Sequence, residues 1–146
     1  MSRLDQTYIY KLDRLKLLIQ KEIDAILGNQ FRTLTMSQFF LLFAVKDLVN
    51  PNQNEIAKYL NISPPAISRQ VTVAEGSNFI RVSRIGDLNQ SKVSLTDDGL
   101  SIFNQAYKII NKHLEHIFKY SEDLAGLSDH LDGLLIKSKG GDSNEY

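Results

Sequence analysis

Apolar residues near the start of the chain recur every three or four positions, which is the spacing of one face of an α-helix. The positions are Tyr8, Leu12, Leu15, Ile19, Ile23 and Ile26. Neighbouring leucines and isoleucines widen this face beyond what a surface helix needs. Gly28 and Asn29 form a stop signal, so the pattern predicts a first helix over about residues 4–28.

The next predicted helix begins at a capping box, in which Thr35 is the cap and Gln38 follows three residues later. The run of residues 39–45 is apolar almost all round, which predicts a helix buried on several sides. Residues 50–51, an Asn-Pro pair, break this helix.

Two short helices separated by a three-residue turn are predicted next. Asn52 can cap the first of them, and residues 61–63 form the turn. Ser63 can cap the second helix, with Pro64 at its first position, and Asn78 can end it. Such a helix-turn-helix places its second helix in the major groove of DNA.

Residues 80–83 and 92–95 alternate apolar and polar side chains, which predicts a β-hairpin with a loop longer than two residues. Thr96 can cap a long amphipathic helix, and a shorter apolar helix follows Gly126. Residues 140–146 have too little apolar surface to fold, so we expect a flexible tail there.

The predicted fold is mainly α: a winged helix-turn-helix over about residues 35–96, flanked by N- and C-terminal dimerisation helices. These helices cover about residues 4–28 and 97–138, within a single domain of residues 1–139. They carry more apolar surface than one small domain can hide, and a symmetric homodimer would bury the excess.

Composition excludes several classes of protein. The 146 residues include no cysteine, so disulfides, thiolate nucleophiles and zinc ribbons are excluded. No apolar run approaches the roughly 20 residues that span a bilayer, and the N-terminus lacks a secretory signal, so we expect a cytoplasmic protein without membrane contact. Lysine plus arginine and aspartate plus glutamate both number 17, so any basic surface for DNA must be local.

In these features the chain resembles the MarR family of bacterial transcriptional regulators. The matching segments are Asn52–Ser63, Ala66–Val71, Phe79–Arg81 and the Val-x-Leu-Thr-x-x-Gly sequence at Val93–Gly99. The resemblance implies a triangular dimer with interleaved terminal helices and two winged domains. It also implies binding to a palindromic operator in double-stranded DNA, often relieved by a small aromatic or anionic effector.

The second helix of the helix-turn-helix carries the candidate DNA contacts. Burying its apolar positions turns Ser68 and Thr72 outward, with Pro65 and Arg69 on adjoining flanks. Arg69 can fork onto guanine O6 and N7, and the helix-turn-helix context favours this contact over the alternative of a solvated charge paired with a carboxylate. Ser68 and Thr72 can bond bases or phosphates. Gln70 could reach an adenine or a phosphate, or could lie at the domain surface.

The wing departs from the family pattern. The family usually has Asp-Arg-Arg before the second strand, with an arginine entering the minor groove, whereas this chain has Asp87-Leu88-Asn89. Arg84 and Lys92 could partly replace that contact by binding phosphates. Arg81, on the first strand, could instead brace the fold by pairing with Glu75 or with the aspartate of the wing.

No catalytic motif is present, so we do not expect an enzyme, and no cofactor is predicted. His113 and His116 stand three positions apart but lack the further ligands of a metal site, so no metal is expected. The aromatic residues Phe39, Phe40, Phe43, Phe103 and Tyr107 suit a core better than an effector pocket, although a family ligand would lie in an aromatic crevice.

The sequence thus predicts a sequence-specific DNA-binding transcriptional regulator. The absent wing arginines and the zero net charge leave one alternative from another class, a winged-helix protein-interaction module with weak or no DNA binding. A third interpretation is a ligand-storing dimer in which the second helix no longer reads DNA.

Overall fold

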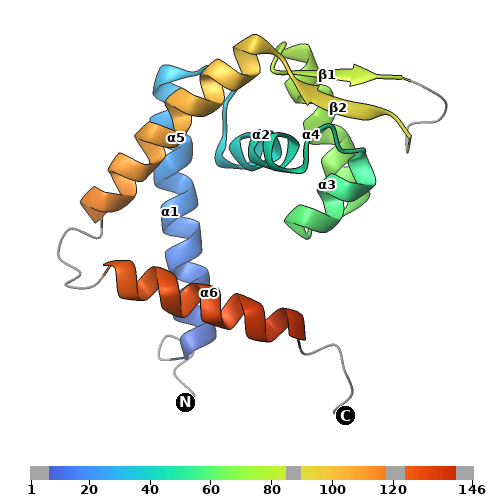
Figure 1. Cartoon of the computed structure of the whole chain (residues 1–146). Helices are drawn as coiled ribbons and strands as arrows, with labels where there is room; N and C mark the ends of the chain where they lie inside the picture. The colour runs from blue at the N-terminus through green and yellow to red at the C-terminus, as the bar shows by residue number, and fades with distance from the viewer. Residues whose placement is uncertain (1–6, 85–89, 118–123, 141–146) are drawn as a thin grey trace. The chain divides into compact units, whose positions relative to one another are not determined.

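The computed structural model describes residues 7–84, 90–117 and 124–140. These residues form six helices and one two-stranded antiparallel sheet (Figure 1). The chain divides into a unit of residues 1–110 and a unit of residues 111–146, each of which is described by itself. The predicted mainly α fold with a winged helix-turn-helix and flanking helices is confirmed.

Helix α1 spans Tyr8–Gln30, so the prediction that Gly28 ends it is wrong. The Phe31 N–H still donates to the Leu27 carbonyl at 2.7 Å, which keeps the last turn helical past the glycine. Only the C-terminal part of α1 is buried, at Ile23 and Leu27. Part of the predicted start, residues 4–6, lies outside the described residues.

Helix α2 spans Met36–Leu48 and is buried on several sides, as predicted. Thr35 caps it, because its hydroxyl accepts from the Gln38 N–H at 3.1 Å. The predicted capping box is only half formed, since the Gln38 side chain turns into the core and is 5% exposed. Asp24 of α1 accepts from the Met36 N–H at 2.7 Å and so ties α1 to the start of α2.

The helix-turn-helix consists of α3 (Gln53–Leu60) and α4 (Pro64–Gly76). Asn61 takes a left-handed conformation, with φ 53°, that ends α3 and begins the turn. The Asn52 and Ser63 side chains cap the two helices as predicted, accepting from backbone N–H groups three residues later. Asn78, with φ 60°, follows the end of α4.

The wing consists of β1 (Ile80–Ser83) and β2 (Lys92–Leu95), the two strands predicted. They pair antiparallel, with Ile80 opposite Leu95 and Ser83 opposite Lys92, and the hairpin projects from the winged-helix region (Figure 1). The Val93 N–H donates to the Pro51 carbonyl at 2.8 Å, which anchors β2 to the segment between α2 and α3. The loop of residues 85–89 lies outside the described residues.

Helix α5 spans Asp97–Ile117, and Thr96 joins it to the end of α4. The Thr96 hydroxyl accepts from the Gly99 N–H at 2.9 Å and donates to the Asn78 carbonyl at 2.6 Å. A Cβ at Gly99 would lie 1.8 Å from the Phe79 carbonyl oxygen. The Thr-x-x-Gly sequence is therefore the joint that holds the wing and α4 against α5.

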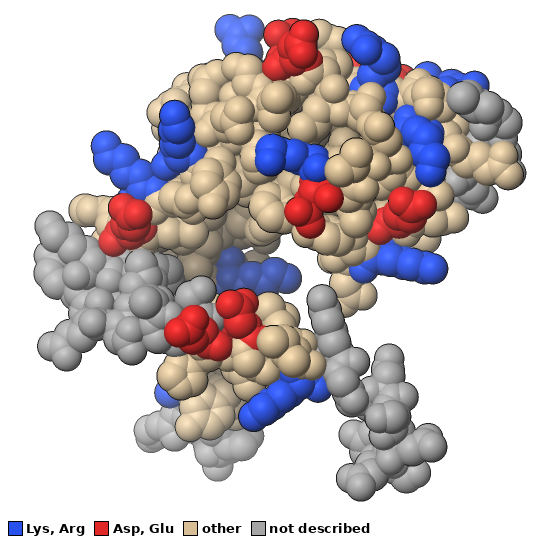
Figure 2. All heavy atoms as spheres, in the orientation of Figure 1, with Lys and Arg blue, Asp and Glu red and all other residues tan. Residues whose placement is uncertain are grey.

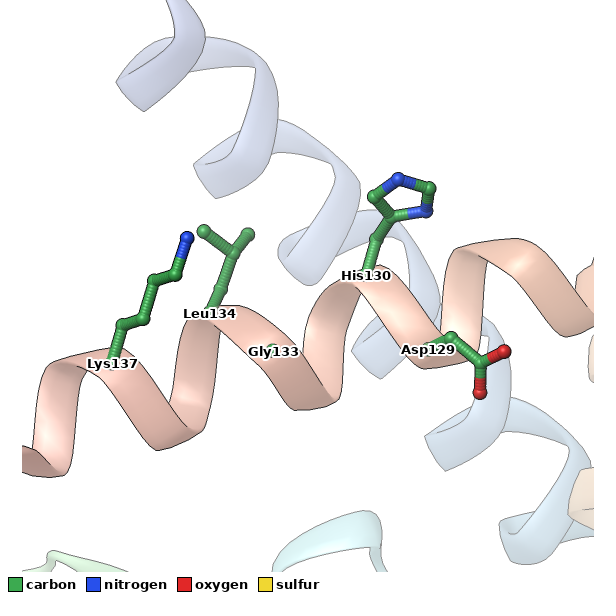
Figure 3. Close-up of a pocket in the computed structure, with 5 residues that line it drawn as sticks. All are labelled: Asp129, His130, Gly133, Leu134 and Lys137. Atoms are coloured by element: carbon green, nitrogen blue, oxygen red, sulfur yellow. The ribbon is translucent and has the colours of Figure 1, made fainter.

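Helix α6 spans Leu124–Gly140 and belongs to the second unit. Its described side chains include the exposed residues Leu131, Leu134, Leu135 and Ile136. Asp129, His130, Gly133, Leu134 and Lys137 line a shallow hollow along this helix (Figure 3). The rest of the predicted tail, residues 141–146, lies outside the described residues. Among the described helices, none is both long enough and apolar enough to cross a membrane.

Candidate nucleic-acid interface

Helix α4 has a buried side and an exposed side. Ile67, Val71 and Ala74 are at most 3% exposed and pack into the core. The opposite side consists of exposed residues, with Ser68 half-buried at its margin; these are Pro65, Arg69, Thr72, Val73 and Gly76. The core therefore fixes which side chains α4 offers to a partner.

Arg69 lies at the centre of the exposed side. Within the described part of the chain, its guanidinium makes no ion pair or hydrogen bond. The carboxylate partner allowed for by the alternative interpretation is not found among those residues. An unpaired guanidinium presents a fork of N–H donors that matches guanine O6 and N7 or a phosphate.

Thr72 is exposed, but its hydroxyl is already engaged. It donates to the Ser68 carbonyl at 3.0 Å, one turn earlier in α4. The hydroxyl oxygen can still accept a hydrogen bond, while the donor is occupied within the helix. A partner of α4 would therefore meet the methyl group of Thr72 as well as its hydroxyl oxygen.

Gln70 lies on the flank of α4 rather than on its exposed side. Its side-chain oxygen is buried and has no hydrogen-bond partner among the described residues. Its backbone carbonyl accepts from the Gln38 side chain of α2 at 3.2 Å. The sequence predicted Gln38 only as part of a helix cap. In the structure its buried side chain links α2 to α4 through this hydrogen bond.

The wing carries three basic side chains outside the loop. Arg84 Nη2 lies 2.8 Å from Glu75 Oε1 of α4, so Glu75 pairs with Arg84 and not with Arg81, which was one of two alternatives. The other alternative, Asp87, lies outside the described residues. Arg84 is close enough because β1 leads back past the end of α4. Arg81 and Lys92 are exposed on the same face of the hairpin, because Lys92 stands opposite Ser83, which is two positions from Arg81 on β1. The Asp87-Leu88-Asn89 departure lies outside the described residues.

Basic and acidic side chains are interspersed on the visible face of the molecule (Figure 2). From Asn52 to Thr96 five basic residues stand against three acidic ones. The winged helix is therefore only mildly basic, and most of its affinity for a duplex would have to come from placed contacts rather than from net charge.

The predicted aromatic residues gather between α2 and α5. The Phe39 and Phe103 rings stack with centroids 5.2 Å apart, and Lys46 Nζ lies 5.6 Å from the Phe103 centroid. Phe40 and Tyr107 are 43% and 47% exposed, so the cluster is part core and part surface. No group of three or more potential ligands that could hold a metal ion occurs in the described part of the chain.

A family model matches part of the chain. The model of the MarR family covers residues 34–87, which include α2, the helix-turn-helix and β1. Over these residues the chain is similar to the MarR family. The resemblance seen in the sequence is thereby confirmed, and members of this family are transcriptional regulators. No curated protein matches the sequence.

Solved MarR-type regulators have the same fold as this chain. The transcriptional regulator BldR from Sulfolobus solfataricus is 18% identical, with a TM-score of 0.79 over 94% of this chain and 99% of that one. MepR from Staphylococcus aureus, in complex with DNA, is 20% identical, with a TM-score of 0.73 over 92% and 98%. The repressor CouR, bound to a 23-mer DNA duplex, is 23% identical, with a TM-score of 0.78 over 95% and 96%. At these identities the likeness establishes the fold.

Proposed function

We propose that the protein is a sequence-specific transcriptional regulator that binds a palindromic DNA operator as a homodimer. The observation that carries the proposal is the exposed side of α4, with the guanidinium of Arg69, which has no partner among the described residues, at its centre. The contacts of α4 would be completed by Pro65, Ser68, Thr72 and, at its flank, Gln70. Lys92 would bind a phosphate, and Arg84 would do so where its ion pair with Glu75 opens. MepR and CouR, which share this fold, have been solved with DNA.

The first half of α1 supports the homodimer. Tyr8, Ile9, Leu12 and Leu18 are between 58% and 84% exposed, which is far more apolar surface than a monomeric helix usually shows to water. A second copy of the chain, related by twofold symmetry, would cover it. Residues 1–139 would then act as one regulator domain. The two α4 helices would read half-sites about 10 bp, or a multiple of it, apart.

The aromatic cluster between α2 and α5 supports relief by a small aromatic or anionic effector. Phe40 and Tyr107 offer ring faces at the surface, and Lys46 offers a positive charge nearby. CouR has also been solved with p-coumaroyl-CoA. A thermal-shift screen of aromatic acids and their thioesters would test for such a ligand, with Lys46→Met as the variant that loses the charge.

The experiment that tests the main proposal is a fluorescence-anisotropy titration against genomic fragments of the host, at low salt. Binding that weakens linearly with the logarithm of the salt concentration, together with recovery of one palindromic sequence, is expected. Complete absence of binding would reject the regulator and favour a winged-helix protein-interaction module. Binding without any sequence preference would reject the operator.

A further inference from the structure

Val73 is an apolar residue on the exposed side of α4, where its side chain is 51% exposed. It follows Arg69 by four positions, so the two Cβ atoms lie about 5–6 Å apart on one face of the helix. A single exposed valine is ordinary on a protein surface, so its surroundings decide its role.

Two further apolar groups lie on the exposed side of α4. Thr72 uses its hydroxyl hydrogen on the Ser68 carbonyl at 3.0 Å, which leaves its methyl group among the outward groups. Pro65, exposed one turn before Arg69, adds an apolar ring. Arg69 is therefore flanked on successive turns of the same helix side by apolar groups.

This arrangement matches one pattern of the major groove. Guanine displays the O6 and N7 acceptors that an arginine binds, and thymine displays a methyl group that apolar side chains contact. We infer that Val73, together with the Thr72 methyl group, reads the 5-methyl group of a thymine close to the guanine bound by Arg69. The inference rests on the proposed function, because it requires α4 to lie in the major groove. Cytosine has only a hydrogen at its 5-position, so the valine would lose its methyl contact, and the adjacent 4-amino group would lie near an apolar side chain that cannot accept its hydrogen bond.

The test begins with the full-length protein and a library of random duplexes, from which the bound sequences are selected. Each thymine of the selected duplex is then replaced in turn by deoxyuridine, which removes the methyl group alone. For the unaltered protein we expect one position in each half-site at which the replacement weakens binding about fourfold, the effect of one buried carbon. Thymines outside the half-sites serve as controls.

The same duplexes are titrated with Val73→Ala and with Val73→Thr, which is nearly isosteric. We expect uracil replacement at that position to weaken the binding of Val73→Ala less than that of the unaltered protein, because alanine leaves less apolar surface beside the Thr72 methyl group. Circular dichroism should be unchanged because the side chain of residue 73 is exposed. Val73→Thr keeps one of the two methyl groups, so its selected sequences should enrich thymine there less strongly than those of the unaltered protein. An equal loss on uracil replacement in the unaltered protein and in Val73→Ala would overturn the inference, as would the absence of any sensitive thymine. Failure to enrich any sequence would overturn the proposed function itself.

Discussion

Arg84, which directly follows β1, and Glu75 of α4 form an ion pair with 2.8 Å between Nη2 and Oε1. The pair joins the wing to the helix proposed to read DNA. Its side chains are 62% and 34% exposed, so it contributes little to stability, as most solvated pairs do. Its larger consequence is electrostatic, because the carboxylate neutralises an arginine that is otherwise suited to bind a phosphate.

Replacing Glu75 by glutamine should therefore strengthen binding to non-specific DNA. Removing one negative surface charge near the duplex should improve the free energy of DNA binding by about 1 kcal/mol, which is a roughly fivefold higher affinity per subunit at low salt. A released Arg84 that contacts a phosphate would also steepen the dependence of log K on log salt by about 0.9 per contact. Anisotropy titrations at several salt concentrations measure both quantities.

Arg84→Gln separates the two effects of the Glu75 substitution. If Arg84 is the group released, Glu75→Gln in the Arg84→Gln background should leave the salt slope unchanged. Glu55→Gln, which removes an exposed carboxylate from α3, is the matched control for charge alone. A steeper slope in the double variant would show that the added phosphate contact comes from another residue.

Arg69→Ala should weaken binding to the selected operator by about 1–3 kcal/mol and loosen the preference at one base position. Arg69→Lys keeps the charge but loses the fork, so it should retain non-specific affinity while losing the same preference. Competition between operator and random duplexes measures the ratio of the two affinities. Unchanged specific and non-specific binding in Arg69→Ala would contradict the assignment.

Much of this fold could be predicted from the sequence because its signals are local. Three helix starts could be predicted from a capping side chain that accepts a hydrogen bond from the backbone N–H three residues later. These caps are Asn52, Ser63 and Thr96. The strands of the wing follow from strict alternation. The prediction that Gly28 ends α1 was wrong, because a glycine ends a helix only where the chain leaves the helical conformation. Here the next turn remains hydrogen-bonded.

The candidate site was harder to predict, because it depends on contacts between distant residues. Gln38 and Gln70 are 32 positions apart, and no local sequence pattern predicts that the Gln38 side chain donates to the Gln70 backbone carbonyl. The choice of Arg84 over Arg81 as the partner of Glu75 depends on how β1 leaves the end of α4. Val73 was not among the predicted site residues, although its spacing from Arg69 places both on one side of a helix.

Gly99→Ala should destabilise the winged helix. The added Cβ would lie 1.8 Å from the Phe79 carbonyl oxygen, and backbone cannot move aside as a flexible side chain can. We expect a loss of about 3 kcal/mol, the upper end for overpacking. Thermal unfolding at fixed protein concentration should show a fall of roughly 6–12 °C.

Gly28→Ala is the matched control for Gly99→Ala. Gly28 lies inside α1, and nothing stands within 4 Å of the Cβ that would be added. Alanine there should raise the free energy of unfolding by about 0.5–1 kcal/mol through its higher helix propensity. Equal effects of the two substitutions would mean that the close approach of α5 to Phe79 does not exist in solution.

The Tyr59 hydroxyl of α3 donates a hydrogen bond to the Asp47 carboxylate of α2 at 2.7 Å. This hydrogen bond, then burial and the negative charge of Asp47, raise the pKa of Tyr59 above its ordinary value near 10. A raised pKa in the folded state means stability that is fully present below about pH 10 and is lost as the pH rises through the folded value.

Tyr59→Phe should therefore lower the free energy of unfolding by about 0.5–1 kcal/mol at pH 7, the net contribution of a typical hydrogen bond. The difference from the unaltered protein should shrink as the pH rises above about 10, because the phenol then ionises in both folded and unfolded chains. Urea unfolding across this pH range measures the difference. Tyr107→Phe is the control, since the Tyr107 hydroxyl makes no hydrogen bond among the described residues. A pH-independent difference for Tyr59→Phe would show that its hydroxyl acts through packing and not through the hydrogen bond to Asp47.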